Sequence, residues 1–298
     1  MVTTHNNLFL NDLKQGETIL ADGAMGTLLH QRGAEIEACF DALNLSQPEL
    51  VESTHRDYLQ AGANMIETNT FGANRFKLSE YGLGDMVKQI NTAAVEIARR
   101  AADSVSHTVY IAGSIGPLGT RLRPYGRISQ ADSQAAFAEQ IGALTKAGAD
   151  VLLFETFTDH SEMLFALEIA RNIALDTPII CSMTFAQDDR TLLGFTPARV
   201  AHELHRAGAD VIGVNCSTGP SQISGILQIM HKAVPDAYFA AMPNAGFPEF
   251  NRGLVMYPAS ADYFGDYALT FKAIGAGVIG GCCFTTPDHI RAMRTALD

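Results

Sequence analysis

The sequence contains no tryptophan, only five cysteines, and fewer basic than acidic side chains among its 298 residues. Its 21 Lys and Arg residues against 32 Asp and Glu residues give a formal charge of -11. A charge of this sign repels the phosphate backbone of nucleic acids and anionic membrane surfaces. The composition therefore argues against nucleic acid as a partner.

Long apolar runs are also absent, because none approaches the roughly 20 residues that cross a bilayer as a helix. Residues 1–11 lack the basic and apolar regions of a signal peptide. The sequence thus predicts a cytoplasmic protein without a membrane partner. Its 47% of hydrophobic residues can bury a substantial core.

The five cysteines do not form the pattern of a disulfide framework. Such frameworks use even numbers of cysteines in small secreted domains, whereas here the number is odd and Cys282 and Cys283 are adjacent. Reduced thiols are expected. For Cys39 and Cys181 we expect simple packing, since cysteine is a small residue that is easily buried.

A short phrase of the type Ala-Gly-Ala-Asp recurs four times, around Gly62, Gly148, Gly208 and Gly275. Each copy follows an amphipathic stretch and leads into a short apolar run, which predicts a helix that ends at glycine and a buried parallel strand. The glycines are 60 to 86 residues apart, enough for two βα units of about 30 residues each. Further strands are therefore expected between the copies.

Eight strands and eight helices result when the intervening segments are included. The strands are expected at 19–21, 109–112, 179–183 and 239–242, and from 65, 151, 211 and 278 onward. The helices are expected at 47–61, 86–103, 129–147, 161–172, 197–207, 221–233, 260–274 and 287–297. Eight units predict an α/β protein with a (β/α)8 TIM barrel, and a doubly wound sheet is the second choice. No linker interrupts the pattern, so a single domain is expected over 1–298.

Barrel enzymes build their sites at the carboxyl ends of the strands, and here these ends are unusually polar. They read Asp22-Gly23, Glu67-Thr68-Asn69, Gly113-Ser114, Glu155-Thr156, Asn215-Cys216, Pro243-Asn244 and Gly280-Gly281-Cys282-Cys283. Three of the five cysteines therefore lie on one rim of the predicted barrel.

Three thiols on this rim can bind Zn²⁺ and leave its fourth position open for a substrate, an arrangement typical of catalysis. Cys282 and Cys283 would point to opposite faces of a regular strand, so a bend is required, and the preceding Gly280 and Gly281 permit it. From residue types alone, packing or redox use is as good an interpretation as zinc.

Two carboxylates on the rim also admit more than one interpretation. Asp22 and Glu155 suit either a general acid and base, as in glycosidases, or the binding of a substrate ammonium group. If neither has a functional role, Asp22 is a turn residue ahead of Gly23 and Glu155 is a solvated carboxylate on the rim. The spacing of His202 and His205 allows a metal site, but their helix belongs to the outer ring, so we expect both in solvent.

Six motifs, taken together, carry a resemblance to a known family. They are Ala21-Asp-Gly-Ala-Met-Gly-Thr27, Glu67-Thr-Asn-Thr-Phe-Gly-Ala-Asn74, Gly113-Ser-Ile-Gly-Pro117, Gly213-Val-Asn-Cys216, Pro243-Asn-Ala-Gly246 and Gly280-Gly-Cys-Cys283. From about Phe9 to Met293 the chain resembles the zinc-dependent homocysteine S-methyltransferase family. It is most similar to the homocysteine-binding module of cobalamin-dependent methionine synthase and of bacterial fusions with methylenetetrahydrofolate reductase. The chain stops after the barrel, so we expect no folate, cobalamin or flavin domain on it.

The resemblance implies that Cys216, Cys282 and Cys283 bind one zinc ion per chain. Asn244 matches a residue that fills the fourth zinc position when substrate is absent, and Asn215 is expected to orient the site around Cys216. In this family the zinc ion holds the substrate sulfur as a thiolate, which makes it the nucleophile.

The resemblance also implies that Asp22 and Glu155 hold the amino group of homocysteine, while the backbone N–H groups of Gly23 and Ala24 position the amino acid. The implied reaction is methyl transfer to the homocysteine thiolate, which yields methionine. The donor is expected to be methylcobalamin on a partner corrinoid protein, or S-methylmethionine or S-adenosylmethionine. Betaine is disfavoured, because its quaternary ammonium group suits an aromatic cage and the chain has no Trp.

One departure from the family pattern is Phe284, since the family usually has glycine after the cysteine pair. A bulky residue reaches positive φ only at a cost, so we expect the local backbone or the substrate mouth to differ. Two alternatives to the enzyme are a non-catalytic homocysteine-binding subunit and a barrel hydrolase that uses Asp22 and Glu155 as its carboxylate pair.

Overall fold

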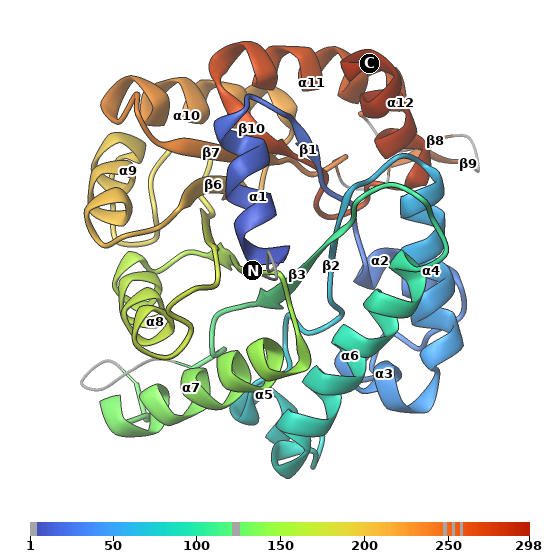
Figure 1. Ribbon diagram of the computed structural model, residues 1–298, viewed down its shortest axis with the longest axis vertical. Coiled ribbons are helices and arrows are strands. Elements are labelled where there is room, and N and C mark those ends of the chain that lie inside the picture. The colour runs from blue at the N-terminus through green and yellow to red at the C-terminus, as the bar shows by residue number, and fades with distance from the viewer. Residues whose placement is uncertain (1–4, 121–125, 247–248, 252–253, 257–258) are drawn as a thin grey trace.

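The computed structural model describes residues 5–120, 126–246, 249–251, 254–256 and 259–298. Eight parallel strands form one sheet in the order β1-β10-β7-β6-β5-β4-β3-β2 (Figure 1). They are β1 (Ile19–Leu20), β2 (Met65–Glu67), β3 (Tyr110–Ile115), β4 (Val151–Phe157), β5 (Ile179–Met183), β6 (Val211–Asn215), β7 (Tyr238–Met242) and β10 (Ala276–Ile279). A parallel bridge between Ala21 and Met65 joins the two outer strands of this order, so the sheet closes into a barrel.

Eight helices surround the barrel as an outer ring (Figure 1). They are α4 (Pro48–Gln60), α6 (Val87–Ala102), α7 (Gln130–Ala147), α8 (His160–Ile173), α9 (Pro197–Arg206), α10 (Pro220–Ala233), α11 (Ala261–Ile274) and α12 (Pro287–Leu297). Side chains of Ser129 and Ser260 cap the first turns of α7 and α11, and Gly148 and Gly275 end the same helices in the left-handed conformation. The predicted (β/α)8 barrel is confirmed.

One strand is longer than predicted and another is irregular. β3 continues to Ile115, so Ser114 belongs to the strand rather than to the loop that follows it. The pairing of β4 with β5 shifts in register between Phe154 and Phe157, and Thr156 has a φ of 61°. This irregularity lies beside Glu155 and, as bulges commonly do, re-aims side chains at the end of the strand.

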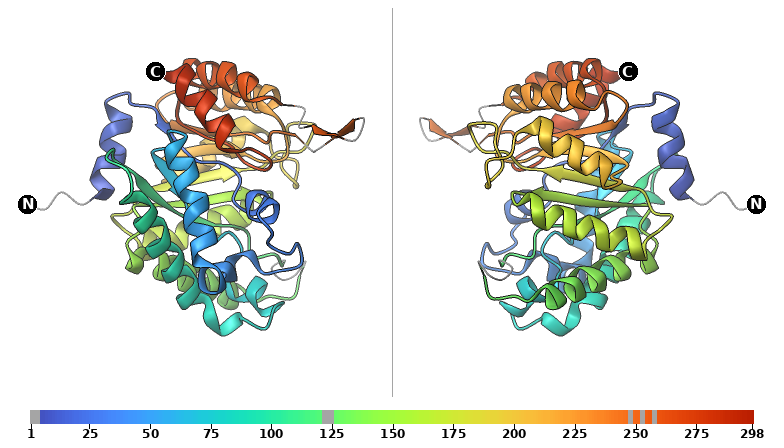
Figure 2. Two further views of the ribbon diagram at one scale, coloured as in Figure 1. Left: turned by 90° about the vertical axis from the view of Figure 1, so that its right-hand side faces the viewer. Right: turned by 90° about the vertical axis from the view of Figure 1, so that its left-hand side faces the viewer.

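Several elements were not predicted. The amino end of the chain forms α1 (His5–Lys14), and short helices follow β1 and β2, namely α2 (Gly26–Gln31), η1 (Phe40–Ala42), α3 (Leu43–Ser46), α5 (Arg75–Ser79) and η2 (Gly84–Met86). An antiparallel hairpin of β8 (Glu249–Asn251) and β9 (Leu254–Met256) precedes α11. Figure 2 shows this hairpin and α1 at opposite ends of the barrel. No helix in the described part of the chain is long and apolar enough to cross a membrane.

Helix α1 closes the amino end of the barrel. Phe9 and Leu13 are buried in a cluster with the inward side chains of the strands, and the Phe9 ring meets the edge of Tyr110 at 5.3 Å between centroids. The end of the Leu13 side chain also packs against Gly277, where a Cβ atom would lie 2.7 Å from it. The site on the opposite rim is thereby isolated from solvent at the amino end.

Truncation of the Phe9 side chain on α1 is expected to destabilise the barrel without disturbing the opposite rim. Phe9→Ala removes a fully buried ring, and such changes raise the free energy of the native state by about 3–5 kcal/mol. The check is urea unfolding together with metal content. An unchanged unfolding midpoint would show that α1 does not contribute to the core.

Candidate metal and substrate site

Three thiols lie together at the carboxyl end of the barrel. Cys216 follows β6, and Cys282 and Cys283 follow β10. Their sulfur atoms are all within 4.8 Å of one another, and the Cys216 and Cys283 sulfurs are 3.8 Å apart. Thiolates on a tetrahedral zinc ion, with bonds of about 2.3 Å, would be separated by about 3.8 Å. Within the described ranges, this is the one group of three or more metal-ligating residues of this kind.

The backbone around the thiols is bent, which allows adjacent cysteines to face the same point. Cys216 and Phe284 both adopt left-handed backbone, with φ values of 61° and 66°. The Cys282 N–H still follows the pairing of β10 with β7 and donates to the Pro243 carbonyl at 2.8 Å, so the bend lies after this residue. Phe284 therefore adopts the positive φ that favours glycine, and the expected difference in the local backbone or the substrate mouth stays a prediction. Left-handed backbone costs about 1–2 kcal/mol per residue, and the Phe284 side chain packs against the core.

Two buried asparagines contact the thiols. Asn215 accepts a hydrogen bond from the Thr156 N–H at 2.9 Å, and its amide nitrogen lies 2.9 Å from the Thr156 hydroxyl and 3.8 Å from the Cys282 sulfur. Asn244 donates to the Cys216 sulfur, while its own Oδ1 is buried without a donor among the described residues. Asn244 therefore brings an unpaired oxygen into the immediate surroundings of the thiols.

The thiols do not ionise independently. Hydrogen bonds from Cys282 and Cys283 lower the pKa of Cys216 to about 3, and the interaction with Cys216 raises the pKa of Cys283 to about 12. The pKa of Cys282 is raised as well, because its thiol keeps its proton in hydrogen bonds with Cys216 and Cys283. The cluster thus accommodates negative charge, which suits a soft cation such as zinc.

Three carboxyl groups lie near the thiols, of which Asp22 and Glu155 are buried and Glu67 is half-buried. Asp22 is 1% exposed and accepts a hydrogen bond from the Glu67 N–H at 3.1 Å, while its other oxygen has no partner among the described residues. Glu155 accepts hydrogen bonds from the Ser114 hydroxyl and from the Glu67 carboxyl. Asp22 and Glu155 were predicted site residues, and Glu67 was missed as one, although its place at a strand end was noted.

Burial makes these carboxyls poor acids. Desolvation is the main cause that raises the pKa of Asp22, Glu67 and Glu155, and their mutual repulsion adds to the effect for Asp22 and Glu67. No ion pair within the described part of the chain joins any of them to a basic side chain. An ammonium group placed among them would supply the missing positive charge.

A cavity of about 700 Å³ is lined by the three thiols and by Glu67 and Glu155, whereas Asp22 and Asn244 are not among its described lining residues. Its wall includes Gly23, Ala24 and, farther out, Phe71 and Lys77. The Lys77 ammonium group lies 4.2 Å from the centre of the Phe71 ring, and Lys77 is the one basic side chain among the described lining residues. The Ala24 N–H already donates to the Thr285 hydroxyl at 3.1 Å. The Gly23 N–H has no acceptor among the described residues, so it is the amide of this segment that a substrate can reach.

The residues for which plain structural roles were expected lie apart from the thiol cluster. Cys181 is fully buried on β5, and Cys39 is half-buried against the cluster around Leu78 while it also lines the cavity. His202 and His205 are exposed on α9, as predicted. Neither histidine is available to the site.

A sequence profile described as Homocysteine S-methyltransferase matches residues 19–297. Methionine synthase of Mycobacterium leprae is 34% identical over 297 residues, which cover 94% of this chain and 24% of the relative. Methionine synthase of Mycobacterium tuberculosis is 33% identical over 304 residues, which cover 97% of this chain and 25% of the relative. The chain spans about a quarter of the length of these curated relatives.

Solved structures with the same architecture include homocysteine methyltransferase MmuM from Escherichia coli. Its metallated form has a TM-score of 0.81 at 27% identity, covering 95% of this chain and 97% of that one. Its oxidised form has a TM-score of 0.82 at 27% identity, covering 96% and 99%. The carboxyl transferase domain of Rhizobium etli pyruvate carboxylase has a TM-score of 0.55 at 12% identity over 99% of this chain and 49% of that one, and so shares the fold alone.

Proposed function

Since the chain belongs to the homocysteine S-methyltransferase family, we propose that it transfers a methyl group to the thiolate of homocysteine and so forms methionine. The observation that carries the proposal is the convergence of three cysteine sulfurs within 4.8 Å at the mouth of the barrel. Three protein ligands leave one tetrahedral position for the substrate sulfur. The carboxyl cluster beside them suits the amino group of the same substrate.

Zinc is the metal that this donor set suits best. Cys216, Cys282 and Cys283 would hold it, because thiolates select zinc over magnesium or calcium. The unpaired Asn244 oxygen would complete the coordination when substrate is absent. When bound, zinc would lower the pKa of the substrate thiol and keep it as a thiolate at neutral pH. A reducing cytoplasmic location, which we also propose, would keep the three thiols available.

The protein's own groups would bind and orient the amino acid. Asp22, Glu67 and Glu155 would surround the ammonium group, with the Ser114 hydroxyl fixing the orientation of Glu155. Asn215 would keep Cys282 in place through its bonds to Thr156 and to the sulfur. Held at both ends, homocysteine would present its sulfur to the cavity for in-line attack on the methyl group.

The methyl donor would approach through the outer part of the cavity. We propose methylcobalamin on a partner corrinoid protein as the donor, with S-methylmethionine and S-adenosylmethionine as free alternatives. Zinc-loaded protein is to be incubated with homocysteine and each donor separately, and methionine is to be measured. Transfer from a free sulfonium donor would identify a self-sufficient enzyme, and transfer only from methylcobalamin would identify the corrinoid route. No methionine with any donor would refute the proposal and leave a binding subunit.

Amino acid binding is expected to release protons from the carboxyl cluster. Burial raises the pKa of each free carboxyl and an incoming ammonium group lowers it again, so binding should release protons and tighten as the pH rises. The ligand for this test is L-2-aminobutyrate, which lacks a thiol and therefore releases no thiol proton. Calorimetry in buffers of different ionisation enthalpy measures the release. Equal apparent enthalpies in all buffers would contradict this role of the cluster.

A further inference from the structure

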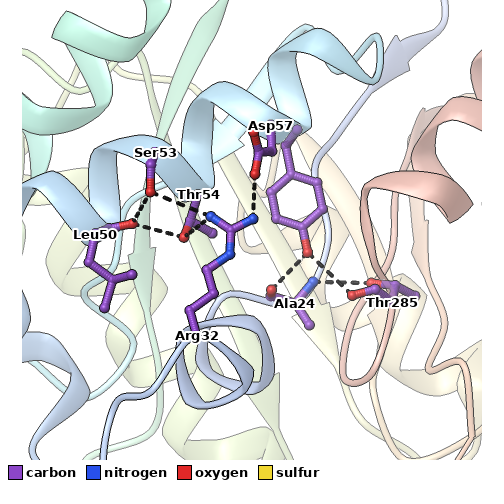
Figure 3. A network of polar contacts seen from close by, with 8 residues as sticks. Ala24, Arg32, Leu50, Ser53, Thr54, Asp57 and Thr285 are labelled. Atoms are coloured by element: carbon purple, nitrogen blue, oxygen red, sulfur yellow. Dashed lines mark hydrogen bonds and ion pairs between the residues drawn. The ribbon is translucent and has the colours of Figure 1, made fainter.

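Two loops that carry the proposed site meet at one buried hydroxyl group. The substrate loop, residues 22–24, follows β1, and the cysteine loop, residues 281–285, follows β10. Thr285, 1% exposed, donates from its hydroxyl to the Cys282 carbonyl at 2.7 Å. The same oxygen accepts from the Ala24 N–H at 3.1 Å, as Figure 3 shows. One side-chain atom therefore connects the backbones of the two loops.

The Thr285 side chain lies close to one glycine of each loop. A Cβ atom at Gly23 would lie 2.5 Å from the Thr285 hydroxyl oxygen, and one at Gly281 would lie 2.7 Å from its Cβ. The Gly281 N–H donates directly to the Asp22 carbonyl at 2.9 Å. The Thr285 side chain thus fills the space beside a glycine on each loop, and a direct backbone bond joins the same two loops.

Tyr58, on α4, contacts both loops through its hydroxyl group. Its buried hydroxyl lies 2.8 Å from the Ala24 carbonyl and 3.2 Å from the Thr285 carbonyl, and its single hydrogen serves both acceptors. Arg32, which follows α2, contacts the same helix through Thr54 at 3.0 Å and Asp57 (Figure 3). Helix α4 is therefore fixed to both ends of the segment that contains α2.

We propose that Thr285, held by Tyr58, is a positioning residue that couples the substrate loop to the cysteine loop. An amino acid bound to Asp22 and to the Gly23 N–H would fix the substrate loop. Through the bond from Ala24 it would also fix the Thr285 hydroxyl and the Cys282 carbonyl. The geometry of the cysteine loop would then become more favourable for a metal ion. Linkage requires the effect to be reciprocal, so bound metal would also tighten amino acid binding. This inference rests on the proposed function, because it takes Cys282 as a metal ligand and Asp22 as a substrate ligand.

The test separates this coupling from direct contact between substrate sulfur and metal. Zinc-loaded full-length protein is mixed with a chromogenic chelator, and zinc release is followed with and without saturating L-2-aminobutyrate, which has no thiol. In the unaltered protein, release should be about 5-fold slower with the amino acid, the lower end of typical couplings. Thr285→Val, of similar shape but without the hydroxyl, should lose this ratio, whereas Thr285→Ser should keep it.

The ratio of the two rates is the readout, because a purely structural weakening would change both rates together. Tyr58→Phe, which removes one oxygen, should reduce the ratio and provides a second variant if Thr285→Val does not fold. An unchanged ratio in both Thr285→Val and Tyr58→Phe would overturn the coupling, as would a ratio of one in the unaltered protein that holds zinc. Unaltered protein that binds no zinc at all would instead refute the proposed function, and the coupling with it.

Discussion

Replacing Cys283 by alanine is expected to remove zinc and to abolish methyl transfer to homocysteine, while the barrel stays folded. The apparent binding free energy of structural zinc sites is about 10–16 kcal/mol over four ligands, so one ligand contributes about 3 kcal/mol. Loss of one thiolate should therefore weaken zinc binding on the order of 100-fold. The half-buried Cys283 lies at the rim rather than in the core, so unfolding should change little.

Cys39→Ala is the matched control for this variant. Cys39 lines the same cavity but is not one of the three clustered thiols. Elemental mass spectrometry of both variants, purified under reducing conditions, measures zinc per chain, and a methionine assay measures transfer. Full activity of Cys283→Ala would contradict the zinc-thiolate mechanism. Loss of zinc from Cys39→Ala would show that the ligand set is assigned incorrectly.

The second large effect is expected for Asp22→Asn, which should raise the homocysteine KM without loss of zinc. A hydrogen bond to a charged group contributes about 1.5–3 kcal/mol, which corresponds to about 10- to 150-fold in affinity. The effect should fall in this range because Asp22 is buried and its Oδ1 has no partner among the described residues. The turnover rate at saturating homocysteine should change much less than KM.

Asp236→Asn is the control, since Asp236 is an exposed carboxylate before β7. Glu67→Gln tests the residue that sequence reasoning missed, and it should raise KM in the same direction as Asp22→Asn. Steady-state kinetics with zinc-loaded protein provide the values. An Asp22→Asn variant with unchanged KM would refute the anchoring role of this carboxyl.

The repeated glycine phrases predicted four of the eight strands, because each marks a helix end and the strand that follows, and their spacing indicated where the other four lie. Gly148 and Gly275 have the left-handed backbone that such a helix end requires. Helix α1 was not predictable in the same way, since no glycine phrase adjoins it and its role depends on packing against Tyr110. The hairpin before α11 was not predicted either, because no glycine phrase adjoins it.

At the site, sequence reasoning found the polar strand ends but not the contacts among them. Cys216 and Cys283 were predicted to converge, and the structure places their sulfurs 3.8 Å apart. The role of Thr285 was not visible, because it depends on three backbone segments that are far apart in sequence. Phe284 adopts a positive φ that its bulky side chain disfavours, and its packing against the core could not be read from the sequence.

The central claim is that the three thiols hold a zinc ion whose fourth position receives the homocysteine sulfur. X-ray absorption at the zinc edge, recorded before and after addition of homocysteine, tests it directly. We expect one zinc per chain with three sulfur neighbours at about 2.3 Å and one lighter ligand, and four sulfur neighbours after addition. Zinc that keeps the same neighbours with homocysteine bound would contradict the account.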